Sequence, residues 1–426
     1  MTPEIKNRIA QIRRGEVPAG YKKIKTIIIP SNWEIFPLRS FVSISSGSTP
    51  ERKTAEYWNG DIPWINTSEL SNTNIIKASE YITQAGVEAA RLHMYLPGTI
   101  LMAMYGQGKT RGTVARLGIE ATINQACVAL EVHERHVVDY VFLQLQHSYH
   151  DIRKLSNSGS QENLNSKIIA SIKVPLAVRE EQIKIAAIFA TQDKVIELKE
   201  KRIAEKQRQK KYLVQQLLTG KKRLAGFSDD WRVEKLKDIS TRISQRNDVR
   251  NTNILTISAQ RGLINQSDFF NKSIASEDKS NYFLLHKGDF AYNKSYSSGY
   301  SFGAIKRLLH YADGIVSPLY ICFRIVCPNV STDFLEQYFE AGIMDQEIQA
   351  FAQEGARNHG LLNISISDFF NSSITLPSYP EQIKIATILC AAGKEIDLLQ
   401  KDLEAEKQKK RALMQLLLTG IVRVKV

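Results

Sequence analysis

The sequence Glu-Gln-Ile-Lys-Ile-Ala at residues 181–186 returns at 381–386, and Leu-Leu-Thr-Gly at 217–220 returns at 417–420. Aligned without gaps at an offset of 200, residues 181–220 and 381–420 share 18 identities in 40 positions. An internal repeat of this length decides the architecture before any local feature does. Two copies are too few for a solenoid, so the sequence indicates a tandem duplication.

Each repeated segment is predicted to form one long helix. Residues 180–218 contain neither Gly nor Pro and are rich in Lys, Glu, Gln, Ile and Leu. Gly220 and Gly420 follow the two segments, where a glycine often ends a helix. Apolar residues recur at heptad spacing, which favours a two-helix coiled coil within the chain; the alternative is that each helix lies on its own domain. The predicted seam is Phe189, Ile196, Ile203 and Leu217 in the first helix and Leu389, Ile396, Leu403 and Leu417 in the second.

The residues between the helices are predicted to form mixed domains with many short strands. Apolar segments of strand length lie at 99–104 and 127–130 in the first half and at 289–292 and 319–323 in the second. The fold class is therefore α+β, a tandem repeat of two mixed α/β domains separated by two long helices. The expected divisions are a basic N-terminal arm or helix at 1–30, a domain at 31–179, a central helix at 180–220, a second domain at 221–379 and a C-terminal helix at 380–426.

Composition narrows the class of protein. With 57 Lys and Arg against 44 Asp and Glu, the net charge is +13, which favours a nucleic acid or another anionic partner. Hydrophobic residues make up 43% of the chain, as in ordinary globular proteins. No apolar run is long enough for a transmembrane helix, and the N-terminus does not read as a secretory signal, so we expect a cytoplasmic protein without membrane contact. Four scattered cysteines predict neither a disulfide framework nor a structural zinc site.

Motifs for catalysis fail on inspection, so we expect no catalytic residue and no metal site. The stretch 103–110 superficially resembles a P-loop, but Ala103 replaces its first glycine and the residues after it do not predict a helix. The histidine pairs His133/His136 and His147/His150 lack a third ligand at a suitable spacing. Neither a G-x-S-x-G elbow nor a dinucleotide-binding glycine motif is present.

Two basic, aromatic loops punctuated by glycine remain, at 105–112 and 293–300. An amide or a guanidinium can bond a base edge in two places, whereas an ammonium is better suited to phosphate. Gln107 and Arg111 are therefore candidates for reading bases, and Lys109 and Lys294 for binding phosphate. Ordinary hairpin loops are the alternative. The full set of candidate DNA-binding residues is Tyr105, Gln107, Lys109, Arg111, Lys294, Tyr296, Tyr300 and Arg357.

Taken together, these features resemble the specificity (S) subunit of type I restriction–modification enzymes, over essentially the whole chain. The glycine loop at 105–112 is similar to that of one class of target-recognition domain. In one departure, Pro175 lies six residues before Glu181, whereas Pro380 adjoins Glu381. The other carriers are the two Glu-Gln-Ile helix starts with their Leu-Leu-Thr-Gly ends, Trp33 with Leu38, its echo Trp231 with Leu236, Gly-Asp-Ile-Pro-Trp-Ile at 60–65 and Asn-Gln-Ala at 124–126.

The resemblance implies two target-recognition domains separated by helices that pair as an antiparallel coiled coil. Each domain would read one half of a split DNA site, and the helices would set the spacer. Because the two domains differ in sequence, the site should be bipartite and asymmetric. The implied partners are double-stranded DNA, two methyltransferase (M) subunits docked on the repeated segments, and restriction–translocase (R) subunits. S-adenosylmethionine, ATP and magnesium would belong to those partner subunits, with no cofactor in this chain.

Three other functions stay open at the level of sequence. One is the specificity subunit of a related type II system with separate S chains, which differs only in its partners. Another is an NTPase or nuclease built on the P-loop-like stretch, and loss of ATP hydrolysis on Lys109→Ala would favour it. The third is a structural coiled-coil scaffold, which would bind no duplex.

Overall fold

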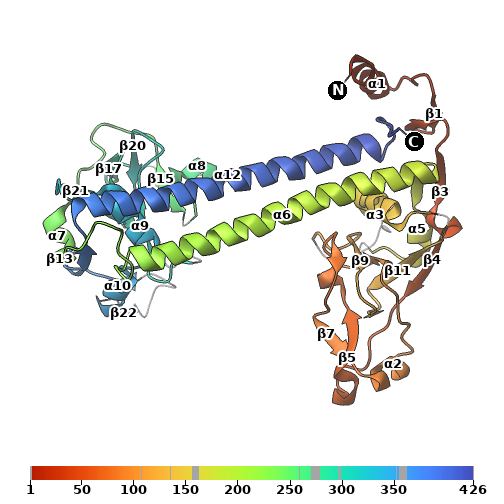
Figure 1. Ribbon diagram of the computed structural model, residues 1–426, viewed down its shortest axis with the longest axis horizontal. Coiled ribbons are helices and arrows are strands. Elements are labelled where there is room, and N and C mark those ends of the chain that lie inside the picture. Colours follow the sequence, from red (N-terminus) through yellow and green to blue (C-terminus); the bar gives the residue numbers. More distant parts are fainter. Residues whose placement is uncertain are drawn as a thin grey trace. The chain divides into compact units, whose positions relative to one another are not determined.

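The structure is a computed structural model (Figure 1) that describes residues 2–106, 108–134, 136–155, 163–258, 260–269, 279–295, 299–351, 353–354 and 362–425. The chain divides into two compact units. Unit 1 comprises Met1–Lys199 and Asp402–Val426, and unit 2 comprises Glu200–Lys401. Each unit holds one mixed domain together with parts of two 39-residue helices, α6 (Arg179–Leu217) and α12 (Tyr379–Leu417).

Unit 1 is built around a five-stranded sheet of order β4-β11-β8-β9-β6, with a three-stranded sheet β10-β5-β7 and the pairs β1-β2 and β12-β3. Its helices are α1 (Pro3–Arg13), α2 (Gln84–Ala89), α3 (Val138–His147), α4 (Tyr149–Lys154) and α5 (Ser166–Ser171), with 3₁₀ turns at Leu38–Ser40, Ala55–Tyr57 and Thr67–Glu69. Its strands are β1 (Tyr21–Ile24), β2 (Ile27–Pro30), β3 (Glu34–Pro37), β4 (Val42–Ser46), β5 (Trp58–Ile65), β6 (Asn74–Ile75), β7 (Glu80–Ile82), β8 (Ile100–Ala103), β9 (Val114–Leu117), β10 (Thr122–Ile123), β11 (Cys127–Val132) and β12 (Lys173–Leu176).

Unit 2 repeats this plan around a four-stranded sheet of order β14-β21-β18-β19, with the pairs β13-β24, β15-β16, β17-β20 and β22-β23. Its helices are α7 (Leu236–Ile239), α8 (Gln266–Phe269), α9 (Thr332–Glu340), α10 (Asp345–Phe351) and α11 (Ile366–Phe370). Its strands are β13 (Arg232–Lys235), β14 (Ser240–Arg242), β15 (Leu255–Ser258), β16 (Gly262–Asn265), β17 (Phe283–His286), β18 (Phe290–Asn293), β19 (Ala304–Arg307), β20 (Asp313–Val316), β21 (Ile321–Ile325), β22 (Gln353–Glu354), β23 (Leu362–Asn363) and β24 (Ser373–Leu376).

The main sheet of each unit is buried on both faces, as the run of apolar residues in its strands requires. In β8, Ile100 and Met102 point into one core, and Leu101 and Ala103 point into the other, because successive side chains alternate across a strand. In β18, Phe290 and Ala291 divide in the same way. The strand order β4-β11-β8-β9 and its counterpart β14-β21-β18-β19 confirm a tandem α+β repeat.

The predicted two-helix coiled coil is confirmed, and its two helices, α6 and α12, run antiparallel. In unit 1, Gln192 of α6 donates to Glu406 of α12 at 2.7 Å, and further along α6 Lys199 pairs with Asp402. Residue numbers thus rise along one helix while they fall along the other. In unit 2, Lys206 of α6 pairs with Glu395 of α12 at 2.9 Å. None of the helices within the described ranges is long and apolar enough to cross a membrane.

The structure buries most of the predicted seam, but not evenly. Phe189 and Leu389 are 1% and 0% exposed, whereas Ile196 is only half-buried. The ends of the seam belong to the domain cores: Phe189 and Leu417 lie in the main core of unit 1, and Leu389 and Leu217 in that of unit 2. Each core therefore contains the start of one long helix and the end of the other. The remaining seam residues Ile203, Ile396 and Leu403 are buried.

The glutamates at the starts of α6 and α12, Glu181 and Glu381, make equivalent contacts. Each is fully buried and paired with an arginine. Glu181 accepts two hydrogen bonds from Arg423 at 2.6 and 2.9 Å and one from Trp33 Nε1 at 2.8 Å. Glu381 accepts two from Arg223 at 3.0 and 2.8 Å. Both arginines stand three residues after the glycine of Leu-Leu-Thr-Gly. Each long helix therefore starts against the segment that follows the other one.

The glutamines beside them hold each domain to its helix. The Gln182 side chain accepts a hydrogen bond from the backbone N–H of Val137 at 3.0 Å and donates to the carbonyl of Ala177 at 2.8 Å. Gln382 likewise accepts from the N–H of Ser331 at 2.8 Å. Val137 and Ser331 are the residues before the first turns of α3 and α9, whose N–H groups need partners outside the helix.

Candidate nucleic-acid interface

Three loops meet at one edge of the five-stranded sheet of unit 1. Strands β4 and β8 end at this edge and β11 begins there, because Ser46 pairs with Val128 and Ala103 pairs with Cys127. The loops that leave these strand ends therefore lie side by side, and we call this the loop edge of unit 1. The three loops are residues 47–53, 104–113 and 124–126.

The predicted loop at 105–112 is part of this edge, and α4 holds its backbone. The Tyr149 hydroxyl donates to the carbonyl of Lys109 at 2.6 Å, and Arg153 donates to the carbonyl of Arg111 at 3.1 Å. Tyr105 is 40% exposed and Lys109 is exposed, so both side chains are available to a ligand. Arg111, in contrast, is only 6% exposed. Gln107 lies outside the described residues.

Unit 2 has an equivalent edge, where β14 and β18 end and β21 begins, because Arg242 pairs with Phe323 and Tyr292 with Ile321. Lys294, the first residue after β18, is half-buried. Tyr296 and Arg357 lie outside the described residues.

Tyr300 is engaged inside unit 2. Its hydroxyl donates to Glu340 at 2.7 Å and accepts a hydrogen bond from Lys306 at 2.9 Å. Lys306 is itself buried and paired with Glu340 at 2.5 Å. Burial, with the Glu340 carboxylate beside it, raises the pKa of the Tyr300 phenol well above its usual value. Tyr300 and Lys306 therefore fasten β19 to α9.

Arg153 and Tyr149 are residues that the sequence analysis missed. They matter because they fix the backbone of the candidate loop from α4, and the Arg153 guanidinium also lies 5.5 Å from the centre of the Tyr149 ring. Their only sequence signal is the spacing of four residues on one helix face. It has no link to residues 105–112 until the fold is known.

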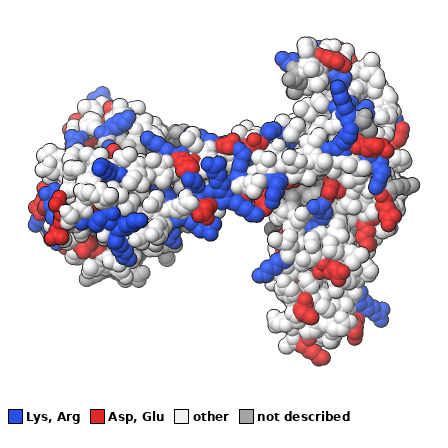
Figure 2. Space-filling view, in the orientation of Figure 1, with Lys and Arg blue, Asp and Glu red and all other residues white. Residues whose placement is uncertain are grey.

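Basic side chains also gather over α6 and α12 on the face shown in Figure 2. Several of them are paired with acids of the neighbouring helix, among them Lys206 with Glu395 and Lys410 with Asp193 at 2.5 Å. Exposed pairs of this kind contribute little to stability. A lysine that is paired with an acid of the neighbouring helix is less available to an anionic partner than an unpaired one.

The residues that the structure describes favour neither a nucleotide site nor a metal site. The P-loop-like stretch connects β8 to β9, which are antiparallel neighbours, so no helix follows that could bind a phosphate at its N-terminus. Within the described ranges, no group of three or more His, Cys, Asp or Glu side chains could hold a metal ion.

Comparison with known proteins identifies the family. The family described as type I restriction modification DNA specificity domain matches residues 30–207. The MjaVIII type I restriction enzyme specificity subunit of Methanocaldococcus jannaschii is 23% identical over 430 residues, covering 95% of this chain and 96% of that relative. Over nearly its whole length, the chain is similar to a type I specificity subunit. The MjaIX specificity subunit of the same organism is 28% identical over 178 residues, which cover 41% of this chain and 40% of that relative.

The fold of this chain is also found in a solved structure. The S subunit of a type I restriction–modification system from M. genitalium superposes with a TM-score of 0.56 at 12% identity, covering 95% of this chain and 99% of that one. The resemblance stated from sequence is therefore confirmed. Subunits of this family recognise DNA and carry no catalytic site or catalytic cofactor, so the NTPase, nuclease and scaffold alternatives are not favoured.

Proposed function

We propose that residues 31–179 and 221–379 are two target-recognition domains that each read one half of a bipartite, asymmetric DNA site. The observation that carries this proposal is the repeated strand order, which gives each unit its own loop edge. The chemistry of the two edges differs. Residue 125, two before the start of β11, is an exposed Gln, whereas Leu319, two before the start of β21, is an apolar side chain that is 70% exposed. Two edges with different side chains favour two different half-sites.

The test of this function uses the host genome. Sequencing of methylated bases in cells with and without this chain should reveal one bipartite, asymmetric motif that is methylated only when the chain is present. A chimaera that exchanges residues 31–179 for those of another specificity subunit should change one half of the motif and leave the other half and the spacer unchanged. Methylation that is the same with and without the chain contradicts the proposal.

We further propose that α6 and α12 set the spacer and carry two methyltransferase (M) subunits, with restriction–translocase (R) subunits completing the complex. S-adenosylmethionine, ATP and magnesium then belong to those partners. Matching apolar surfaces support two equal docking sites. Ile183, Ile188 and Leu198 of α6 are 50%, 37% and 53% exposed. Their counterparts 200 residues later, Ile383, Ile388 and Leu398, are 43%, 36% and 66% exposed.

These surfaces predict the stoichiometry of assembly. Replacing Ile183 and Ile188 with Asp should remove one of the two M subunits, because a charge on an apolar contact must be desolvated without a partner. The same replacement at Ile383 and Ile388 should remove the other M subunit, and all four replacements together should remove both. Native mass spectrometry of the complex measures this directly. Retention of both M subunits by the fourfold variant would show that docking occurs elsewhere.

Lys109 offers a separate prediction about phosphate contact. Lys109→Ala should weaken binding of the assembled complex to all sequences alike and lower the slope of log K against log salt by about one unit, because one phosphate contact is lost. The measurement is duplex binding at several salt concentrations. A change in base preference, with an unchanged slope, would contradict this role.

A further inference from the structure

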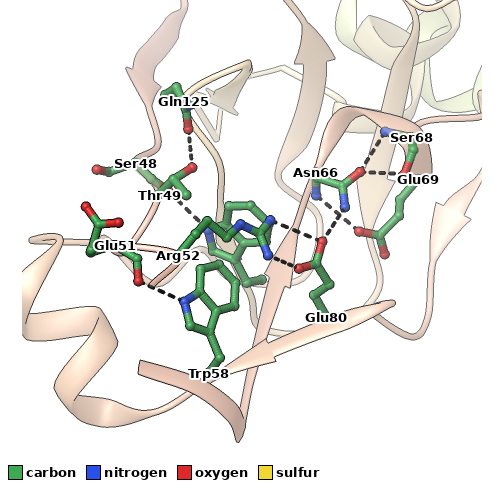
Figure 3. Close-up of polar contacts among 11 residues, drawn as sticks. Ser48, Thr49, Glu51, Arg52, Trp58, Asn66, Ser68, Glu69, Glu80 and Gln125 are labelled. Atoms are coloured by element: carbon green, nitrogen blue, oxygen red, sulfur yellow. Dashed lines mark hydrogen bonds and ion pairs between the residues drawn. The ribbon is translucent and has the colours of Figure 1, made fainter. Parts of the chain in front are cut away.

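The loop edge of unit 1 holds a second group of polar side chains, in the loop that follows β4. The Arg52 guanidinium lies 3.9 Å from the ring centre of Trp58 and 4.9 Å from that of Trp64. Its two terminal nitrogens both donate to the Glu80 carboxylate, one at 3.4 Å. Figure 3 shows the guanidinium reaching toward Glu80 across the indole rings. We call these four residues the Arg52 cluster.

The backbone around Arg52 is fixed by the same aromatic residues. Trp64 Nε1 donates to the carbonyl of Ser48 at 3.0 Å, and Trp58 Nε1 donates to the carbonyl of Glu51 at 3.1 Å. Glu80 is held in turn by Asn66, whose amide donates to it at 3.2 Å (Figure 3). The Arg52 hydrogen bond also holds the pKa of the Glu80 carboxyl below its usual value, so the carboxylate stays ionised. A side chain held in this way is preorganised for recognition.

Arg52 nevertheless faces solvent, since 53% of its side chain is exposed. Glu80 accepts hydrogen bonds from the two terminal nitrogens, whereas Nε–H makes no hydrogen bond to the part of the chain that the structure describes. That edge of the guanidinium could therefore serve a ligand. Next to it, the exposed Gln125 accepts a hydrogen bond from Thr49, so its loop is joined to that of Arg52 (Figure 3). The amide nitrogen of Gln125 makes no hydrogen bond to the part of the chain that the structure describes.

The charged side chains around Arg52 bear on whether it would contact a phosphate or a base of the DNA. Glu51 and Glu80 lie within the group drawn in Figure 3, and their negative charge disfavours a phosphate. An Arg fork held by a carboxylate matches the paired acceptors of guanine in the major groove, and a Gln amide matches adenine. Lys109 lies on the neighbouring loop of the same edge and is not held in this way by a carboxylate of the described residues. Its ammonium group is suited to the phosphate backbone of DNA.

We propose that Arg52 and Gln125 are specificity-determining residues of the first recognition domain, with Arg52 reading a guanine and Gln125 an adenine in the major groove of one half-site. This proposal rests on the proposed function. Glu80 is a positioning residue, since it orients Arg52 and does not itself reach the base.

The experiment uses the complex assembled from this chain and its M subunits, and measures binding to duplexes with both half-sites randomised. Arg52→Lys keeps the positive charge but loses the fork, so preference for guanine at one position should fall by about tenfold or more, since a good bidentate contact supplies about 1–3 kcal/mol. Gln125→Ala should relax a neighbouring position. Glu80→Gln should relax the same position as Arg52→Lys, which loss of fold alone would not do.

Arg39→Lys is the matched control, because Arg39 is exposed just before β4 starts, at the other end of that strand. It should change no preference. A wild-type complex without sequence preference would defeat the proposed function itself. A selective wild-type complex whose preferences survive both Arg52→Lys and Gln125→Ala would overturn only the inference. Uniform weakening of all sequences by Arg52→Lys, with a lower salt slope, would likewise overturn it by making Arg52 a phosphate contact. Thermal melting of each variant shows whether the fold is intact.

Discussion

Replacing Arg423 with Ala should destabilise unit 1 by about 2–4 kcal/mol, because it leaves the carboxylate of Glu181 buried with most of its partners removed. Glu181 is 0% exposed, and after the change Trp33 Nε1 is the one donor to it that remains among the described residues. The fact that 31% of the Arg423 side chain is exposed keeps the figure below that of a fully buried pair. The measurement is denaturant unfolding of the chain, followed by probes specific to unit 1.

The control for this prediction is Lys425→Ala, an exposed change two residues further on, which should be neutral. The double variant Glu181→Gln with Arg423→Met should recover part of the lost stability, because a buried ion pair can often be replaced by a less polar pair of similar size. If Arg423→Ala unfolds at the same denaturant concentration as the wild type, the Glu181 carboxylate has another source of compensation and its pair with Arg423 does not stabilise unit 1.

The internal repeat could be predicted from the sequence, but the contacts made by its repeated residues could not. Eighteen identities in 40 positions predict two equivalent helices and a tandem fold, both of which the structure has. A glutamate at a helix start is normally read as a solvent-exposed residue that favours the helix dipole. Glu181 is instead buried against an arginine 242 positions away. The available signal was the Arg that follows each Leu-Leu-Thr-Gly by three residues, and it becomes meaningful only when tertiary contacts are known.

The candidate interface was predicted in part. Glycine spacing located the loop at 105–112, which lies on the loop edge of unit 1. Spacing could not reveal that Arg111 is buried, because its burial depends on tertiary contacts, such as that of Arg153 on α4 with the loop. Arg52 was not singled out at all. It comes to this edge because β4 lies beside β11 in the sheet, and strand order is not encoded in a local pattern.

The heptad pattern also predicted the structure only in part, because it located the seam but not how deeply each seam residue is buried. Heptad spacing treats all seam positions as equivalent, and the predicted coiled coil exists. Burial along the seam nevertheless varies, because the ends of α6 and α12 leave the two-helix contact and enter the domain cores. Leu389 lies in the main core of unit 2 and is fully buried, whereas Ile196 belongs to neither main core and remains half-buried.

This difference predicts a large contrast between two substitutions that the heptad pattern would rank alike. Leu389→Ala should destabilise unit 2 by about 3–5 kcal/mol, because the side chain is fully buried and the packed core around it cannot collapse into the space. Ile196→Ala should cost about 1 kcal/mol, because much of that side chain already contacts water. Both are measured by denaturant unfolding of the full chain, with the melting of unit 1 and unit 2 followed separately. Assembly with M subunits provides a second readout, since Leu389→Ala should lose the partner bound at Ile383 and Ile388 before the one bound at Ile183 and Ile188. Equal losses of stability at the two positions would mean that the seam is a uniform coiled coil and that its ends are not shared with the domain cores.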